Sequence, residues 1–134
     1  MFKLIKIINS GVNVPEPVRM PKASGVTVKR GTLLTLSQGV VNNCTATTAP
    51  RYVALADAAA TDTHSVCAEI SESMRFDAPV TADPASLTVG AKVTLATDTD
   101  GAAYGVTATT ASGVATVVDL CAATAAGDMI TVKF

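Results

Sequence analysis

The sequence predicts an all-β fold: a small β-barrel or sandwich of short antiparallel strands, preceded by an extended N-terminal arm. From Gly25 onward the chain of 134 residues is a succession of short runs rich in Val, Thr and Ala, separated by Gly, Asp and Pro. Strand-sized runs at regular spacing, without long amphipathic helices, are typical of an all-β domain. Hydrophobic residues make up 49% of the chain, aromatic residues 4%, and there is no Trp. The core is therefore expected to consist of Val, Leu, Ile and Ala in a single domain.

The first 24 residues are expected to form the arm. Residues 1–8 alternate loosely between apolar residues and lysines, which favours a short strand or an extended segment. The prolines that follow lack a backbone donor, so they exclude a helix and make a central strand improbable. The sequence leaves open whether the arm packs on its own domain or on a neighbour. The residues predicted to contact a partner all lie here and are Phe2, Leu4, Val14, Pro15, Pro17, Arg19 and Pro21.

The β domain is predicted to span residues 25–134. Its expected strands are residues 26–29, 32–36, 51–55, 63–70, 87–89, 92–95, 104–108, 114–121 and 129–134. Residues 40–41 lead into a polar stretch at residues 42–50. Residues 71–84, which contain two prolines, are expected to be mostly connection, with residues 74–76 as a candidate extended segment. Asp100 and Gly101 give the clearest hairpin signal, because a tight primed turn needs the positive φ that these residue types tolerate.

Charge is distributed unevenly along the chain. Residues 1–51 carry seven basic side chains against one acidic one, and residues 52–134 carry three against ten, so the halves have net charges of about +6 and −7. One interpretation is that the opposite charges keep a folded monomer soluble. The other is that the basic N-terminal segment docks on an acidic surface of a neighbouring copy or of another protein. Nucleic acid is not expected as a partner, because the basic residues are scattered and no aromatic residues are interleaved with them.

Three cysteines without a pairing motif argue against a disulfide framework and for synthesis in a reducing compartment. Each is expected to be a buried, unreactive thiol. The apolar stretch at the N-terminus is short and interrupted by Lys6, so export is not expected. No stretch approaches the length of a membrane span, and no membrane partner is predicted.

No cluster of residues suited to catalysis is apparent, and neither an enzymatic activity nor a cofactor is predicted. His64 is the single histidine, and with Asp62 it does not make up a metal site. Asp98 and Asp100 resemble the opening of a calcium loop, but the distal glutamate is missing, so a hairpin turn is the better interpretation. Sheet edges and a proline-stiffened arm are instead suited to binding protein by strand addition.

Several motifs in about residues 25–134 share one pattern, which is strand–Gly–strand units with a late Gly-Asp before the final strand. They are GVTVKRGTLLTL at 25–36, YVALAD at 52–57, VGAKVTL at 89–95, Asp100-Gly101, and GDMITVK at 127–133. In these motifs the chain resembles the head decoration (capsid cement) proteins of tailed phages.

This resemblance implies a non-enzymatic virion protein that binds the outer surface of an assembled capsid and stabilises contacts between capsomers. The implied partners are the major capsid protein and the chain itself, as a homo-oligomer in which a trimer is favoured. Modest affinity per site suffices when oligomeric contacts multiply avidity. The alternative is another virion component, such as a head-fibre base, a tail-tube piece or a receptor-binding module.

Overall fold

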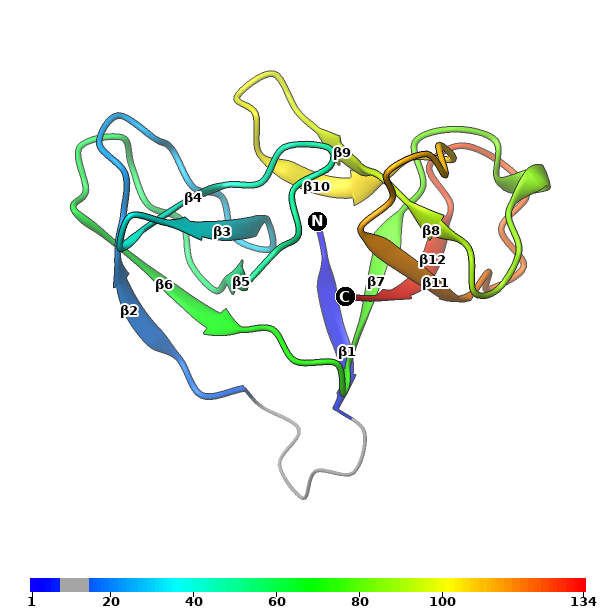
Figure 1. Cartoon of the computed structure of the whole chain (residues 1–134), viewed down its shortest axis with the longest axis horizontal. Coiled ribbons are helices and arrows are strands. Elements are labelled where there is room, and N and C mark those ends of the chain that lie inside the picture. Colours follow the sequence, from blue (N-terminus) through cyan, green and yellow to red (C-terminus); the bar gives the residue numbers. More distant parts are fainter. Residues whose placement is uncertain (8–14) are drawn as a thin grey trace.

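Two antiparallel β-sheets make up the computed structural model, which describes residues 1–7 and 15–134 (Figure 1). The five-stranded sheet A holds, in spatial order, β1 (Lys3–Ile7), β7 (Met74–Pro79), β12 (Met129–Lys133), β11 (Ala115–Asp119) and β8 (Lys92–Val93). The seven-stranded sheet B holds β2 (Val18–Pro21), β6 (His64–Glu69), β5 (Tyr52–Ala54), β3 (Leu33–Ser37), β10 (Ala103–Val106) and β9 (Leu95–Thr97), with β4 (Val40–Asn43) paired to β3. The all-β prediction is confirmed. Of its two forms, the described strands match the sandwich, because neither sheet closes into a barrel.

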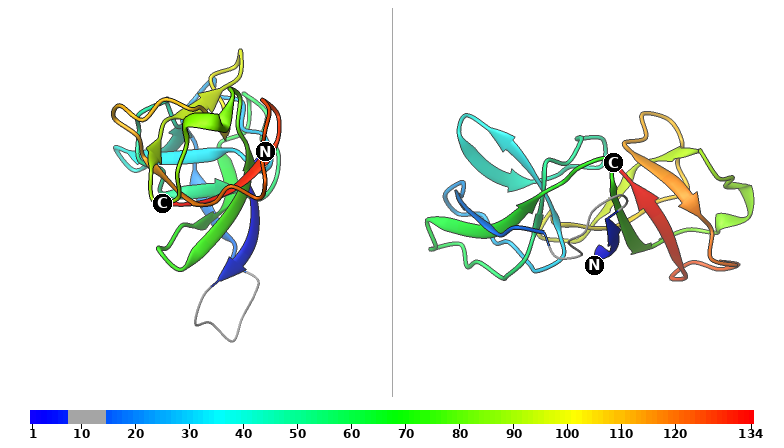
Figure 2. Two further views of the ribbon diagram at one scale, coloured as in Figure 1. Left: turned by 90° about the vertical axis from the view of Figure 1, so that its right-hand side faces the viewer. Right: turned by 90° about the horizontal axis from the view of Figure 1, so that it is seen from below.

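Three short links join or curve the sheets. β8 pairs with β11 in sheet A and β9 pairs with β10 in sheet B, and only Thr94 separates them, so one extended segment crosses between the sheets. A parallel bridge between Val80 and Val106 connects the end of β7 to β10. Another, between Lys22 and Val41, brings the chain after β2 beside β4. Seen from below, the strands form two groups with β1 between them (Figure 2).

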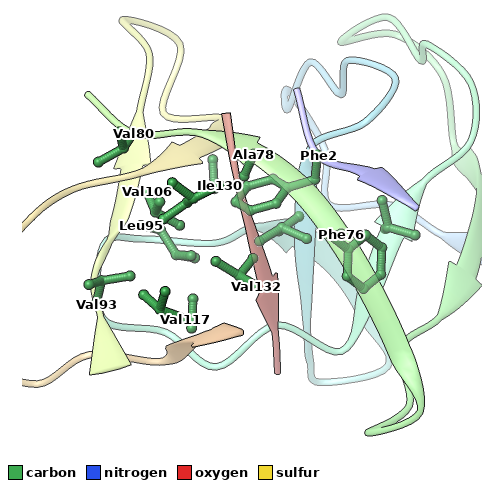
Figure 3. Close-up of a cluster of buried hydrophobic side chains, with 14 of the residues drawn as sticks. Phe2, Phe76, Ala78, Val80, Val93, Leu95, Val106, Val117, Ile130 and Val132 are labelled. Carbon is green, nitrogen blue, oxygen red and sulfur yellow. The ribbon is translucent and has the colours of Figure 1, made fainter. Parts of the chain in front are cut away.

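The main apolar core is shared by both sheets. Phe76, Ile130 and Val132 of sheet A and Leu33 and Leu95 of sheet B are buried in it, and Figure 3 shows several of these side chains converging. A second cluster contains Val28, Leu34, Val41, Tyr52, Ala54, Ala58 and Cys67. Because successive side chains of a strand point to opposite faces, the neighbours Leu33 and Leu34 of β3 enter different clusters. Sheet B is therefore apolar on both faces along β3.

The prediction that residues 71–84 are mostly connection is wrong. β7 pairs with β1 on one side and β12 on the other, so it lies inside sheet A. Met74, Phe76 and Ala78 are buried and alternate with half-buried residues, the pattern of a strand with one face in the core. Pro79 stands at the last position of β7, where a missing backbone donor interrupts the ladder least. The alternation lies before both prolines, Pro79 and Pro84, so neither proline interrupts it.

Other strand predictions were partly wrong. Residues 26–29 contain only one bridge, in which Val28 and Ala58 exchange two backbone hydrogen bonds of 2.9 Å. Residues 87–89 contain no strand, and β4 begins at Val40 and extends two residues into the stretch predicted to be polar. The hairpin at Asp100 and Gly101 is confirmed: it joins β9 to β10, and Gly101 has a φ of 76°.

The described parts of the predicted arm are strands of the two sheets, which corrects the idea of a separate segment ending at residue 24. β1 pairs with β7 in sheet A, and β2 pairs with β6 in sheet B. Phe2 is 2% exposed in the main core, so the apolar residues at this end are held by burial. β2 is an edge strand, in agreement with the expectation that prolines exclude a central position.

Candidate interaction surface

Ionisable groups do not converge on a reacting centre in residues 1–7 and 15–134, where no set of three His, Cys, Asp or Glu residues is placed to bind a metal. His64 is exposed on β6, and its Nδ1 lies 2.9 Å from the hydroxyl of Thr63. No helix in the described residues is both long and apolar enough to span a membrane.

The carboxylate of Asp98 organises the β9–β10 turn. Its Oδ1 accepts hydrogen bonds from the backbone N–H groups of Asp100 and Ala102, both at 2.9 Å. Lys29 Nζ lies 2.9 Å from Asp98 Oδ2 and 2.8 Å from Asp100 Oδ2, which ties this turn to the loop before β3. The hydrogen bond from Lys29, followed by the backbone bonds, lowers the pKa of Asp98. Hydrogen bonds to Asp100 and Asp98 raise the pKa of Lys29. The ammonium group of Lys29 thus contacts both carboxylates, and the predicted hairpin turn is confirmed by the pairing of β9 with β10.

The cysteines differ in exposure. Cys44 and Cys67 are buried, and burial raises the pKa of their thiols to about 12 and about 11. Cys121 is exposed, with a φ of 50°, and its Sγ lies 3.4 Å from the hydroxyl of Thr131. The expectation of three buried thiols is therefore wrong for Cys121. The apolar residues around it in the sequence belong partly to the turn after β11, outside the core.

The structure separates the residues predicted to contact a partner. Phe2 is buried and Leu4 is half-buried against the main core, so Phe2 packs mainly inside the chain and Leu4 keeps part of its surface at the hollow described below. Val14 lies outside the described residues. Pro15 is half-buried. Those that remain exposed are Pro17, Arg19 and Pro21, on and before the edge strand β2.

A hollow of about 430 Å³ lies beside β1. One wall is the start of the chain and β1, and the opposite wall is the end of β5 with the residue after it. Its lining residues are Met1, Phe2, Lys3, Leu4, Pro15, Arg30, Gly31, Val53, Ala54 and Leu55. The hydrogen bond from Phe2 N to Gly31 O, at 2.8 Å, joins two of these lining residues. Its volume is in the range of about 300–1,000 Å³ that is usual for ligand sites.

Basic side chains surround this hollow and β1. Lys3 and Arg30 line the hollow, and Lys6 of β1 lies opposite Arg75 of β7 in the strand register. None of these four side chains forms a salt bridge within the described residues. Two carboxylates lie nearby and offset part of this positive charge. Asp57 accepts a 2.7 Å hydrogen bond from the backbone of Arg30, and Asp77, opposite Lys3, accepts one from the hydroxyl of Thr131 at 2.8 Å.

Sequence reasoning placed Lys3 and Leu4 on a binding segment but missed the wall opposite. Gly31 was recognised as a turn residue, and Val53 and Leu55 as parts of a strand, without any sign that they face β1. The signal that could have found them is the positive φ of Gly31, 77°, at which the chain turns back against Phe2.

Comparison with known proteins gives one solved structure to report. No protein-family model matches the chain, and no curated protein matches it. The chain is similar to the head fiber gp8.5 N base in bacteriophage phi29, with a TM-score of 0.54 and 21% sequence identity. The similarity covers 89% of this chain and 94% of that one. At this identity the likeness shows a shared fold.

Proposed function

We propose that this chain is a non-enzymatic structural protein of a tailed-phage head and acts as the base of a head fibre. The observation that carries the proposal is the fold likeness to the phi29 head fiber base, which extends over nearly the whole of both chains. A likeness of this extent means that no large part of that base lacks a counterpart here. Function does not follow from fold alone, so the proposal also needs a surface suited to binding protein.

The surface supports a binding role through its strand edges. β1 and β8 are the edges of sheet A, and β2 is an edge of sheet B. Exposed Pro17, Arg19 and Pro21 lie on or before β2, and we propose that they contribute to contact with the major capsid protein on the outer surface of the head. Many weak contacts of this kind gain strength when several copies act together, which is why a homo-oligomer, with a trimer favoured, is part of the proposal.

The second candidate is a capsid cement protein, and it rests on the sequence motifs of residues 25–134. Both candidates bind the outside of the head, and they differ in what binding does to it. A cement protein lies between capsomers and stabilises them against disruption. A fibre base needs only to be anchored, and it presents a further segment away from the head.

The decisive experiment adds the purified chain to capsids of the phage that encodes it, prepared without this protein. Co-sedimentation measures binding, cryo-electron microscopy gives the copy number, and calorimetry gives the disruption temperature of the capsids. A fibre base binds and leaves the disruption temperature unchanged, whereas a cement protein raises it. A chain that does not bind capsids at all contradicts both candidates.

A surface variant refines the same experiment. Arg19→Glu reverses an exposed charge on β2 and is expected to weaken capsid binding, with Lys92→Glu on β8 as the matched control. If the two variants change capsid binding equally, β2 is not a specific part of the contact surface.

A further inference from the structure

We infer that the free edge of β1 and the hollow beside it form a docking site for an extended segment of a partner protein that carries acidic side chains. The segment would add to β1 as a further strand of sheet A. This inference goes beyond the proposed function and does not depend on it, because it concerns the isolated chain and a peptide.

The first observation is that β1 has one unpaired edge. It is the outermost strand of sheet A, and within residues 1–7 and 15–134 its backbone is paired only with β7. A strand edge of this kind leaves N–H and C=O groups able to pair with another chain. Peptide recognition by strand addition uses such groups for affinity and side-chain pockets for specificity.

The second observation is that apolar surface is exposed around this edge. Met1 is 58% exposed and Ile5 of β1 is 46% exposed, and both are among the six large apolar side chains with high exposure in the described residues. The hollow adds Leu4, Val53 and Leu55 as apolar lining. An added strand could therefore place alternate apolar side chains into the hollow while its backbone pairs with β1.

The third observation is the sign of the charge. Lys3 and Arg30 line the hollow without a salt bridge, and Lys6 is aligned with Arg75 across the β1–β7 pair. Like charges directly opposite each other destabilise a strand pair, so an incoming carboxylate would relieve an unfavourable arrangement. The nearby carboxylates of Asp57 and Asp77 offset only part of this charge, because four basic side chains stand against two acidic ones.

Lys3 and Lys6 favour an acidic segment of another protein over a second copy of β1 as the added strand. Lysines and a bulge are common protections of an exposed edge, and β1 has both, since its register shifts between Leu4 and Lys6. Two copies of β1 side by side would bring their lysines together, which disfavours self-pairing. An acidic segment turns the same charges into attraction, so the edge selects its partner by repulsion as well as by attraction.

The test uses the full chain and three fluorescent octapeptides. The first alternates Glu with Val or Ile, the second has Lys in place of Glu, and the third is the Glu peptide with alternate backbone nitrogens methylated. We expect the Glu peptide to bind in an anisotropy titration, with affinity falling as salt is added. The Lys peptide should bind at least about tenfold more weakly, because its charges are repelled. The methylated peptide should also bind at least about tenfold more weakly than the Glu peptide, because methylation removes its backbone hydrogen-bond donors.

Protein variants locate the site. Lys3→Glu and Lys92→Glu make the same charge change on the two opposite edge strands of sheet A. Lys3→Glu is expected to lower the affinity for the Glu peptide about tenfold, and Lys92→Glu is expected to lower it less than about twofold. Thermal unfolding of each variant checks that it is folded, and hydrogen exchange of the unaltered chain should show new protection of β1 amides when the Glu peptide is bound.

Three results would overturn the inference. In the first, the Glu peptide does not bind at about 1 mM. In the second, backbone methylation leaves its binding unchanged. In the third, the new hydrogen-exchange protection lies away from β1.

Discussion

Phe2 and Phe134 pack edge to face, with ring centroids 5.7 Å apart and an angle of 66° between the rings. Phe134 also contacts Phe76, at a centroid distance of 5.6 Å. Phe2 precedes β1, Phe76 lies in β7 and Phe134 follows β12, and these strands are neighbours in sheet A. All three phenylalanines of the chain thus form one cluster, and its contacts stabilise the position of β1 beside the central strands of sheet A.

Phe2→Ala is expected to destabilise the chain by about 3–5 kcal/mol, the usual cost of removing a buried phenylalanine. The loss includes transfer of the ring to water, the cavity left behind and the edge-to-face contact. Urea unfolding followed by circular dichroism measures it. Ile5→Ala, which removes an apolar side chain that is 46% exposed, is the control and should cost less than about 1 kcal/mol. Equal effects would mean that Phe2 is not held in the core in solution.

Deletion of residues 1–7 is expected to be more damaging than Phe2→Ala. It removes the core ring and the whole of β1, and it exposes the edge of β7. The loss should approach the whole stability of a small domain, about 5–15 kcal/mol. Circular dichroism and a urea titration of the truncated chain provide the measurement. If it unfolds at the same urea concentration as the full chain, these residues are the separable arm that the sequence suggested.

Local patterns in the sequence were sufficient for the class of fold and for several strands. Turn residues and alternation predicted the regions of β3, β5, β6, β10, β11 and β12 because those signals are short-range. β7 was recognised only as an extended candidate at residues 74–76, because Pro79 and Pro84 follow closely and prolines are poorly compatible with a central strand. Pairing of β7 with strands from both ends of the chain decides its structure, and that is not a local property.

The interaction surface was harder to predict than the fold. Composition identified the basic N-terminal segment, but it could not say which side chains point inward. Phe2 and Lys3 are adjacent in sequence, and the strand geometry buries one in the core and leaves the other exposed beside the hollow. The hollow itself depends on the approach of β1 to Val53 and Leu55, about 50 positions away in the chain.

Thiol labelling should distinguish Cys121 from the other two cysteines. Cys121 is exposed, whereas burial keeps Cys44 and Cys67 out of solvent and raises the pKa of their thiols, so little thiolate is present at neutral pH. With a thiol reagent at pH 8, one group should react quickly in the folded chain and all three in urea. Cys121→Ser should abolish the fast reaction. Fast labelling that persists in this variant would show that a second thiol is accessible.

Stability at acid pH should depend on Asp128. Its Oδ2 accepts hydrogen bonds from Thr124 N at 2.8 Å and Ala125 N at 3.0 Å, which lower the pKa of this carboxyl below its ordinary value of 3.8. Because the folded pKa is the lower one, the group stabilises the fold above pH 3.8 and this contribution is lost as the pH falls through the folded pKa. Asp128→Asn should therefore lower the free energy of unfolding at pH 7. At pH 3 the difference in the free energy of unfolding between the variant and the unaltered chain should be smaller than at pH 7. Urea titrations at both pH values, with Glu72→Gln as a charge control, provide the measurement, and a pH-independent difference would contradict it.

Gly31→Ala is expected to weaken the packing of Met1 and Phe2 against Gly31. Gly31 has a φ of 77°, and an added Cβ would overlap the side chain of Met1 and lie 3.1 Å from the carbonyl oxygen of Phe2. Gly39 has nearly the same φ, 81°, but a Cβ there meets nothing within 4 Å, so Gly39→Ala is a matched control for backbone strain alone. Both substitutions should cost about 1–2 kcal/mol from the left-handed conformation. Gly31→Ala should cost about 1 kcal/mol more, because the crowded Met1 and Phe2 must shift.

Urea unfolding of the two glycine variants gives the difference, and hydrogen exchange shows where it acts. The amide of Phe2, which donates to Gly31 O at 2.8 Å, should exchange faster in Gly31→Ala and be unchanged in Gly39→Ala. Since Met1 and Phe2 also line the hollow, faster exchange would also mean that this wall of the hollow has loosened. Equal stability losses with unchanged exchange at Phe2 would show that the segment is held by β1 pairing and the phenylalanine cluster, without help from the close approach at Gly31.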